Sequence, residues 1–277
     1  MTNTHTIIIQ GGLGNQLFQI FTLINYCIQN KCNFIFPMNM QDWDQKRFPY
    51  WDSFLYTLKE YTRPNEQIDS IIEYMESEFH YNEIPRFTTD IKFNGYFQTE
   101  LYFKEHFESI CKLIGVREKQ AMIKSKYNLY DNTIGLHFRM GDYGNPHHHP
   151  IIPDTYYINS LNFIINKTKK TDWNIYYACE KDDDDVVFMR IQNIKQHFAS
   201  LNFIKISNDI DEWKQMLFMS ICKHNIIANS SFSWWSAYFN QYNEKIVCYP
   251  SLWFGPAKDN FNLKDIYPDK WNKINII

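Results

Sequence analysis

The segment HFRMGDY, residues 137–143, combines side chains that could bind an anion and move a proton. It ends an apolar run that predicts a buried strand over residues 133–139. Alternate residues of a strand point to the same face, so His137 and Arg139 share a face at its carboxyl end. The guanidinium of Arg139 suits a phosphate, because it donates two parallel hydrogen bonds and stays charged. The other interpretation is an Arg139–Asp142 ion pair that only fixes the turn.

A second candidate anion site is the segment NSSFSWW, residues 229–235, which lies between an apolar run and a predicted helix. Helix N-termini attract anions through N–H groups that lack intrahelical partners and through the helix macrodipole. Serine is also among the best N-cap residues, so these serines can serve to start the helix as well. We interpret Trp234 and Trp235 as core side chains rather than as a ligand platform.

Two further runs contain residue types that ligate metals, EKDDDD at residues 180–185 and HHH at residues 147–149. The acids directly follow a predicted strand and begin a predicted helix, which suits the positive end of the helix dipole and solvent. The histidines lack a carboxylate at helical spacing, which favours a solvated loop. We therefore expect no metal site. Because His147 follows Arg139 closely in sequence, it could reach the same site and act as a base.

The glycine-rich segment GGLGNQLFQ, residues 11–19, follows an apolar run, as a nucleotide-binding turn would. A dinucleotide fingerprint requires Gly-x-Gly-x-x-Gly and an acidic residue about 20 positions later. Leu17 stands at the third glycine position, and the next predicted strand, residues 33–36, is followed by Pro37 and no carboxylate. The turn is therefore not predicted to bind a dinucleotide.

The second half of the chain provides a scaffold for these segments, because predicted strands and helices alternate there. Predicted strands cover residues 133–139, 174–179, 202–206, 225–228 and 245–249, and predicted helices cover residues 154–168, 183–198, 211–224 and 232–241. This alternation predicts a parallel, doubly wound α/β sheet, which binds ligands at the carboxyl ends of its strands.

The first half opens with one βα unit and then becomes irregular, with helix-like segments near residues 66–78 and 102–114. We expect two Rossmann-like lobes that face a central cleft. The N-terminal lobe would comprise residues 1–131, and the C-terminal lobe would comprise residues 132–277.

Composition excludes several classes of function. The chain has 28 Lys and Arg against 31 Asp and Glu and no basic run, so binding to nucleic acid or an anionic membrane has no electrostatic basis. The six cysteines lack the spacing of a zinc site, which predicts reduced core thiols. Neither a signal peptide nor a transmembrane segment is apparent, and we expect a cytoplasmic protein. The sequence leaves the oligomeric state open.

Five segments of the chain occur in the order of a known family. They are GGLGNQLFQ, GYFQTELYF at residues 95–103, HFRMGDY, SICKHNIIANSSFSWWSAYFN at residues 220–240 and YPSLWF at residues 249–254. With them the chain resembles the α-1,2-fucosyltransferases of glycosyltransferase family 11, especially the bacterial and viral members. The resemblance implies a GT-B fold, GDP-β-L-fucose as donor, a galactose-type glycan as acceptor, inversion at the anomeric carbon and no essential metal.

The resemblance also implies which residues bind the donor. It places Arg139 on the β-phosphate and His137 beside the guanine or the pyrophosphate. The residues that would complete the pyrophosphate cradle are Asn229, Ser230, Ser231, Phe232 and Ser233. Those that would face the donor from the N-terminal lobe are Gly14, Asn15 and Gln16.

On the acceptor side, the resemblance implies a supporting role for residues 95–103. The acceptor hydroxyl also needs a base on the face of the sugar opposite the leaving group. His147 is the first choice by its position in the sequence, and Asp142 is the second.

Two positions depart from the family's pattern. The family usually has His-x-Arg-Arg, whereas Met140 replaces the second arginine here, and Gln215 stands where an aspartate is common. Both changes remove charge near the donor and leave open a GT-B glycosyltransferase that uses another sugar nucleotide. A glycan-binding protein without turnover is the third hypothesis.

Overall fold

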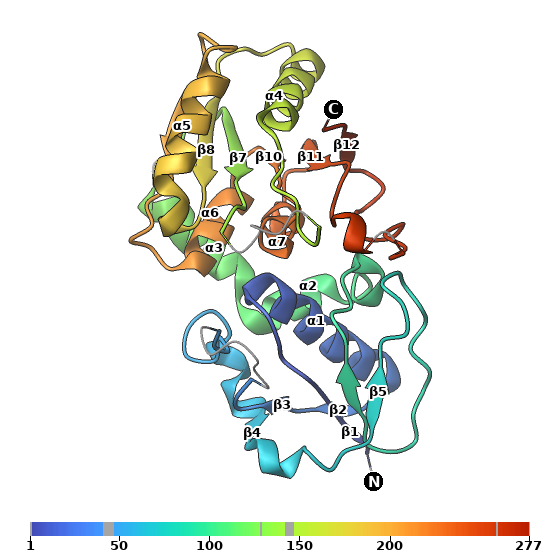
Figure 1. Ribbon diagram of the computed structural model, residues 1–277. Coiled ribbons are helices and arrows are strands. Elements are labelled where there is room, and N and C mark those ends of the chain that lie inside the picture. Colours follow the sequence, from blue (N-terminus) through green and yellow to red (C-terminus); the bar gives the residue numbers. More distant parts are fainter. Residues whose placement is uncertain (1, 41–46, 128, 142–146, 259, 277) are drawn as a thin grey trace. The chain divides into compact units, whose positions relative to one another are not determined.

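The computed structural model describes residues 2–40, 47–127, 129–141, 147–258 and 260–276. The chain divides into two compact units, each built on a parallel β-sheet (Figure 1). Unit 1 comprises Met1–Glu118 and Phe261–Asp269, and unit 2 comprises Lys119–Asn260 and Lys270–Ile277.

Unit 2 contains a six-stranded sheet with the order β12-β11-β10-β7-β8-β9. Its strands are β7 (Thr133–His137), β8 (Asn174–Ala178), β9 (Asn202–Lys205), β10 (His224–Ile226), β11 (Val247–Pro250) and β12 (Asn272–Ile274). The chain runs outward from β7 to β9, then returns to the other side of β7 and runs outward from β10 to β12. The strand order therefore reverses between β7 and β10, as in a Rossmann fold, where ligands bind at the carboxyl ends beside the reversal.

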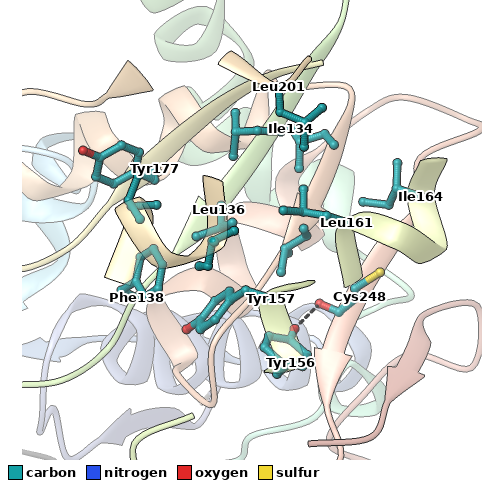
Figure 2. Close-up of a cluster of buried hydrophobic side chains, with 14 of the residues drawn as sticks. Ile134, Leu136, Phe138, Tyr156, Tyr157, Leu161, Ile164, Tyr177, Leu201 and Cys248 are labelled. Atoms are coloured by element: carbon teal, nitrogen blue, oxygen red, sulfur yellow. Dashed lines mark hydrogen bonds between the residues drawn. The ribbon is translucent and has the colours of Figure 1, made fainter. Parts of the chain in front are cut away.

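The helices of unit 2 pack on both faces of this sheet. They are α4 (Asp154–Thr168), α5 (Asp184–Lys195), α6 (Glu212–Ser220), α7 (Ser231–Phe239) and the part of α3 (Val116–Lys126) from Lys119 onward. Ile134 and Leu136 on one face of β7, and Phe138 just after the strand, are buried in a cluster with apolar residues of α4 (Figure 2). Apolar residues of α5 belong to the same cluster. On the other face, a Cβ at Gly135 would lie 3.1 Å from the Met219 carbonyl oxygen, so glycine lets α6 approach the sheet.

Unit 1 contains a four-stranded sheet with the order β2-β1-β6-β5 and a separate β3-β4 pair. The strands are β1 (Thr4–Ile7), β2 (Asn33–Phe34), β3 (Phe36–Pro37), β4 (Thr62–Arg63), β5 (Glu73–Met75) and β6 (Lys92–Asn94), and the helices are α1 (Leu13–Asn30) and α2 (Phe107–Ile114). Short 3-10 helices in the two units are η1 (Tyr56–Tyr61), η2 (Asn65–Gln67), η3 (Glu100–Tyr102), η4 (Lys181–Asp183) and η5 (Pro256–Lys258). Helix α1 is buried along most of its length, which explains the apolar character of its sequence.

The structure confirms the α/β class, and α4 spans the residues predicted for it. The prediction of a helix near residues 66–78 is wrong, because residues 73–75 form β5, which pairs with β6 through Glu73 and Lys92. Sheet pairing over this distance in sequence outweighs local propensity. In the described part of the chain, no helix combines the length and hydropathy needed to cross a bilayer.

The units divide between residues 118 and 119, whereas the sequence analysis set the boundary between residues 131 and 132. Helix α3 explains the difference, since Gln120 Nε2 donates to Ser220 Oγ at 2.7 Å and to the Phe239 carbonyl oxygen at 3.1 Å within unit 2. Residues 261–269 return to unit 1, where the carboxylate of Asp265 accepts a hydrogen bond from the Tyr81 N–H at 3.1 Å.

All six cysteines are free thiols, and five of them are buried. Burial raises the pKa of every one of these thiols, which keeps them protonated and poor nucleophiles. The burial of five cysteines agrees with the prediction of core thiols.

Candidate active site

The carboxyl edge of the unit 2 sheet brings together two segments that the sequence predicts to bind an anion. His137 is the last residue of β7, and Phe232 lies in the first turn of α7, which follows β10. Their ring centroids are 5.2 Å apart. The end of β7 and the first turn of α7 therefore meet at His137 and Phe232, where the strand order reverses.

His137 is buried and neutral. The residue is 4% exposed, and its carbonyl oxygen accepts a hydrogen bond from the Tyr157 hydroxyl at 3.1 Å. Burial, reinforced by the charge of Arg139, lowers the pKa of His137 to about 3. Its Nδ1 atom is buried and has no hydrogen-bond partner among the described residues. A neutral imidazole has one donor and one acceptor nitrogen, so His137 can bond to an uncharged ligand group.

Arg139 forms an ion pair with Glu180, the N-cap residue of η4 at the carboxyl end of β8. The next strand thus supplies the carboxylate, and Asp142, the partner considered in the sequence analysis, lies outside the described residues. The Gly141 N–H donates to Asp183 Oδ2 at 2.9 Å, and a Cβ at Gly141 would lie 2.4 Å from Glu180 Oε2. The loop after β7 therefore packs directly on the acidic run.

These contacts give the acidic run a role that the sequence analysis missed. Asp184 accepts hydrogen bonds from Asn208 and pairs with Lys205, so it too is engaged within unit 2. Over the ranges that the structure describes, no three His, Cys, Asp or Glu side chains are grouped so that they could hold a metal ion. The acidic run positions the β7 loop.

The position of the missing second arginine is occupied by Met140, whose sulfur lies 3.7 Å from Arg190 Nη1 of α5. Arg190 is itself engaged, since it donates to Asp154 Oδ1 and to the Ile152 carbonyl oxygen, both at 2.5 Å. Arg190 therefore stabilises the start of α4. The other departure, Gln215, is buried in α6 and donates to the Ile210 carbonyl oxygen at 3.2 Å.

At the start of α7, two of the predicted cradle side chains hold the turn together. Asn229 Nδ2 donates to the carbonyl oxygens of Pro150 at 3.0 Å and Trp253 at 3.1 Å. Ser233 Oγ accepts from the Ala228 N–H and donates to the Ser230 carbonyl oxygen. These groups shape the turn, and the backbone N–H groups of the first turn are the donors suited to an anion.

Ser230 is the N-cap residue of α7, although its hydroxyl makes no capping hydrogen bond within the described structure. Ser231 begins the helix and is partly exposed, as is Phe232. Trp234 and Trp235 are fully buried, which confirms their interpretation as core residues.

The glycine segment connects β1 to α1 in unit 1. Gly11 has a φ of +75°, Gly12 is the N-cap residue, and Gly14, Asn15 and Gln16 lie in the first turn of α1. The buried amide of Gln16 donates to the carbonyl oxygens of Gly11 at 2.9 Å and Phe48 at 3.1 Å, so this side chain fixes the turn. The role of these residues toward a donor stays a prediction.

His147 is exposed, and its carbonyl oxygen accepts a hydrogen bond from the Ala257 N–H at 2.8 Å. His149 packs against Phe254, with ring centroids 5.3 Å apart. The histidine run thus lies beside residues 254–257 of unit 2. The function of His147 as a base stays a prediction, and the other candidate, Asp142, is not among the described residues.

Comparison with known protein families assigns the chain to one of them. The model of the family described as "Glycosyl transferase family 11" matches residues 2–275. The chain belongs to glycosyl transferase family 11. A family 11 assignment agrees with the motifs that meet at the carboxyl edge of the unit 2 sheet.

Two Escherichia coli proteins are related to this family 11 chain. It is 28% identical to an alpha-1,2-colitosyltransferase in an alignment of 199 positions that covers 66% of this chain and 62% of the relative. It is 31% identical to the O-antigen biosynthesis glycosyltransferase WbnK in an alignment of 174 positions that covers 58% of this chain and 54% of the relative. The chain thus spans less than two thirds of the length of either relative.

The fold of this family 11 chain is similar to that of a solved structure, a mutant of Arabidopsis thaliana FUT1 in complex with GDP. The TM-score is 0.53 at 11% identity, and the match covers 89% of this chain and 70% of the other. The α/β fold with Rossmann-like lobes of the GT-B class, expected from the sequence, is confirmed.

Proposed function

We propose that this family 11 chain is an inverting glycosyltransferase that moves L-fucose from GDP-β-L-fucose to a hydroxyl group of a galactose-type glycan, forming an α-1,2 linkage. The observation that carries the proposal is the contact between His137 and the first turn of α7 where the strand order reverses, with Arg139 two residues after His137 at the same end of β7. The name of the related alpha-1,2-colitosyltransferase supports the linkage.

In the proposed reaction, the acceptor oxygen forms a bond to the anomeric carbon while the bond to the β-phosphate oxygen breaks and GDP leaves. Negative charge grows on that phosphate oxygen. Arg139 and the first-turn N–H groups at Ser231 would stabilise it, and a preorganised donor of this kind typically changes the rate by about 10²–10³. Because these groups supply the positive field, the enzyme needs no metal.

The proton of the acceptor hydroxyl passes to a base on the opposite face of the sugar. His137 is unsuited to this step, because a pKa of about 3, which results from burial, is far below neutral pH. We retain His147 as the first candidate and Asp142 as the second. His137 would instead hydrogen bond to the guanine or the pyrophosphate.

A second candidate function is transfer of another sugar from a nucleotide donor. Met140 in place of a second arginine and the colitosyltransferase relative favour this alternative. Colitose is L-fucose without one ring hydroxyl group, so a fucose pocket and a colitose pocket differ by little. The third candidate is a glycan-binding protein without turnover.

The proposal includes a cytoplasmic site of action. Its support is the chemistry of the cysteines, since all six are free thiols and five are buried. Thiols persist unpaired in reducing compartments.

The decisive experiment offers the chain GDP-fucose, GDP-colitose or UDP-galactose together with a panel of galactose-terminated glycans. We expect transfer from GDP-fucose and an α-1,2 linkage in the product by NMR. Transfer from another donor alone would favour the second candidate. Glycan binding with neither transfer nor donor hydrolysis would favour the third.

A further inference from the structure

Unit 1 holds a carboxylate that the proposed mechanism does not use. Glu76 directly follows β5, the neighbour of β6 in the sheet. Its Oε2 atom accepts hydrogen bonds from the Tyr96 N–H at 2.7 Å and the Phe97 N–H at 3.0 Å, and Oε1 also accepts from the Phe97 N–H at 3.0 Å. The carboxylate therefore anchors the backbone that follows β6.

The anchored backbone has an unusual conformation. Phe97 has a φ of +51°, in the left-handed region that residues other than glycine seldom adopt. A Cβ at Gly95 would lie 2.4 Å from the Glu76 Cβ, so glycine is required where the glutamate approaches. Such outliers persist when their surroundings hold them, and they cluster at functional sites.

Residues 95–98, which we term the 95–98 loop, connect Glu76 to the glycine segment. Gln98 Nε2 donates to Asn15 Oδ1 in the first turn of α1 at 2.8 Å. The Gly95 carbonyl oxygen accepts from Gln19 Nε2, further along α1, at 3.2 Å. Glu76 thus fixes one end of a chain of contacts that ends at Asn15.

The 95–98 loop also presents a side chain that suits a sugar. Tyr96 is 36% exposed, and an exposed aromatic ring offers a flat apolar surface with a polar tip. Gln98, two residues further along the chain, is buried, and its amide donates to Asn15.

We propose that Glu76 is a positioning residue, which holds the 95–98 loop so that the exposed ring of Tyr96 can contact a sugar of the acceptor. This inference rests on the proposed function, because that function defines the acceptor. Separately, burial raises the pKa of Glu76 to about 7, even though the two N–H groups that it binds oppose the shift. The hydrogen bonds thus hold the carboxyl group in a position where burial disfavours its charged form.

The test compares Glu76→Ala, Glu76→Gln and the control Glu78→Ala, which removes an exposed acid two residues away. Loss of the hydrogen bonds to the Glu76 carboxyl group should raise the KM of Glu76→Ala for the sugar acceptor by at least about tenfold. The GDP dissociation constant should stay unchanged. Glu76→Gln keeps an oxygen acceptor for the two N–H groups, so its KM should lie near that of the wild type, and Glu78→Ala should not differ from it.

A wild-type acceptor KM in Glu76→Ala would overturn the inference. So would equal loss of kcat in Glu76→Ala and Glu76→Gln with KM unchanged, since that result indicates proton transfer by the carboxyl group itself. If Glu76→Ala fails to fold, Tyr96→Ala replaces it, and an unchanged KM there would again contradict the inference.

Amide hydrogen exchange separates this inference from the proposed function, because it needs neither donor nor acceptor. The Tyr96 and Phe97 amides should exchange faster in Glu76→Ala than in Glu78→Ala. Faster exchange in a protein that transfers no sugar would support the anchor and reject the proposed function. Equal exchange would reject the anchor, whatever the activity.

Discussion

The guanidinium of Arg139 is paired with the carboxylate of Glu180 across the carboxyl ends of two adjacent strands, β7 and β8. The Arg139 side chain is 14% exposed, and that of Glu180 is 42% exposed. Carboxylate and phosphate both accept two hydrogen bonds from a guanidinium. A donor phosphate that binds Arg139 must therefore displace Glu180 or share the guanidinium with it.

Substitution Glu180→Gln should consequently tighten GDP binding. A partly exposed ion pair contributes only about 0–1 kcal/mol, so the gain should not exceed roughly fivefold in the dissociation constant. Isothermal titration measures it, with Asp182→Asn as a control that removes the same charge from an exposed position. Weaker binding to Glu180→Gln than to Asp182→Asn would show that Glu180 assists the donor instead.

Nucleotide selectivity tests the proposed site of His137. The buried Nδ1 of His137 has no hydrogen-bond partner in the described part of the chain, and a guanine placed against it would satisfy groups that uracil leaves unpaired, at a cost of roughly 1–3 kcal/mol for each group. Thermal-shift measurements should therefore show larger stabilisation by GDP than by UDP at equal concentration. Equal shifts would count against guanine recognition at this edge.

The stability of the protein should depend on pH through Glu76. Burial raises its pKa from 4.5 to about 7, so between these values the native state keeps a proton that the unfolded state has released. The stability that Glu76 contributes is fully present below pH 4.5 and is lost as the pH rises through about 7. The tyrosines that interact with it, Tyr74 and Tyr102, have pKa values raised by burial above 10 and stay neutral.

Urea unfolding of the wild type and Glu76→Gln, from about pH 5 to about pH 8, measures this contribution. The wild type should lose stability relative to the variant as pH rises, because the variant has no proton to release. If the free energies of unfolding of the two proteins changed in parallel with pH, the pKa of Glu76 would be the same in the native and unfolded states.

Metal dependence offers another check. Arg139 and the N-terminus of α7 would supply the positive field, so sugar transfer should continue in excess EDTA at an unchanged rate. Complete loss of transfer in EDTA, followed by rescue with manganese, would contradict this account and direct attention to residues 142–146, which lie outside the described structure.

The alternation of strands and helices from β7 to β11 and the sheet edge that carries the candidate site follow from local patterns, whereas β12 was not predicted. Strand and helix periodicity predicts α4 over its observed span, and two-residue alternation places His137 and Arg139 together. Glu180 was not predicted as the partner of Arg139, because their contact depends on the pairing of β7 with β8. That pairing joins residues about forty positions apart, which local periodicity does not report.

The same reason explains what was missed in unit 1. Strand β5 has three residues and no alternation strong enough to reveal it, and its pairing with β6 is what places Glu76 under the 95–98 loop. The engagement of Asn229 with Pro150 and Trp253 likewise depends on residues distant in sequence. Sequence reasoning found the segments, and tertiary contacts decide which of their side chains are engaged in holding the fold.

The most direct test of the central claim is the kcat of Arg139→Lys for fucose transfer from GDP-fucose. Lysine keeps the charge but loses the planar fork, and no second arginine follows at position 140, where Met140 stands. We predict a fall in kcat of at least about 10², the scale of a lost transition-state donor. The unfolding midpoint should hardly change, because the ion pair with Glu180 contributes only about 0–1 kcal/mol. A variant with near-normal kcat would contradict the role of Arg139 and the placement of the donor phosphate at this edge of the sheet.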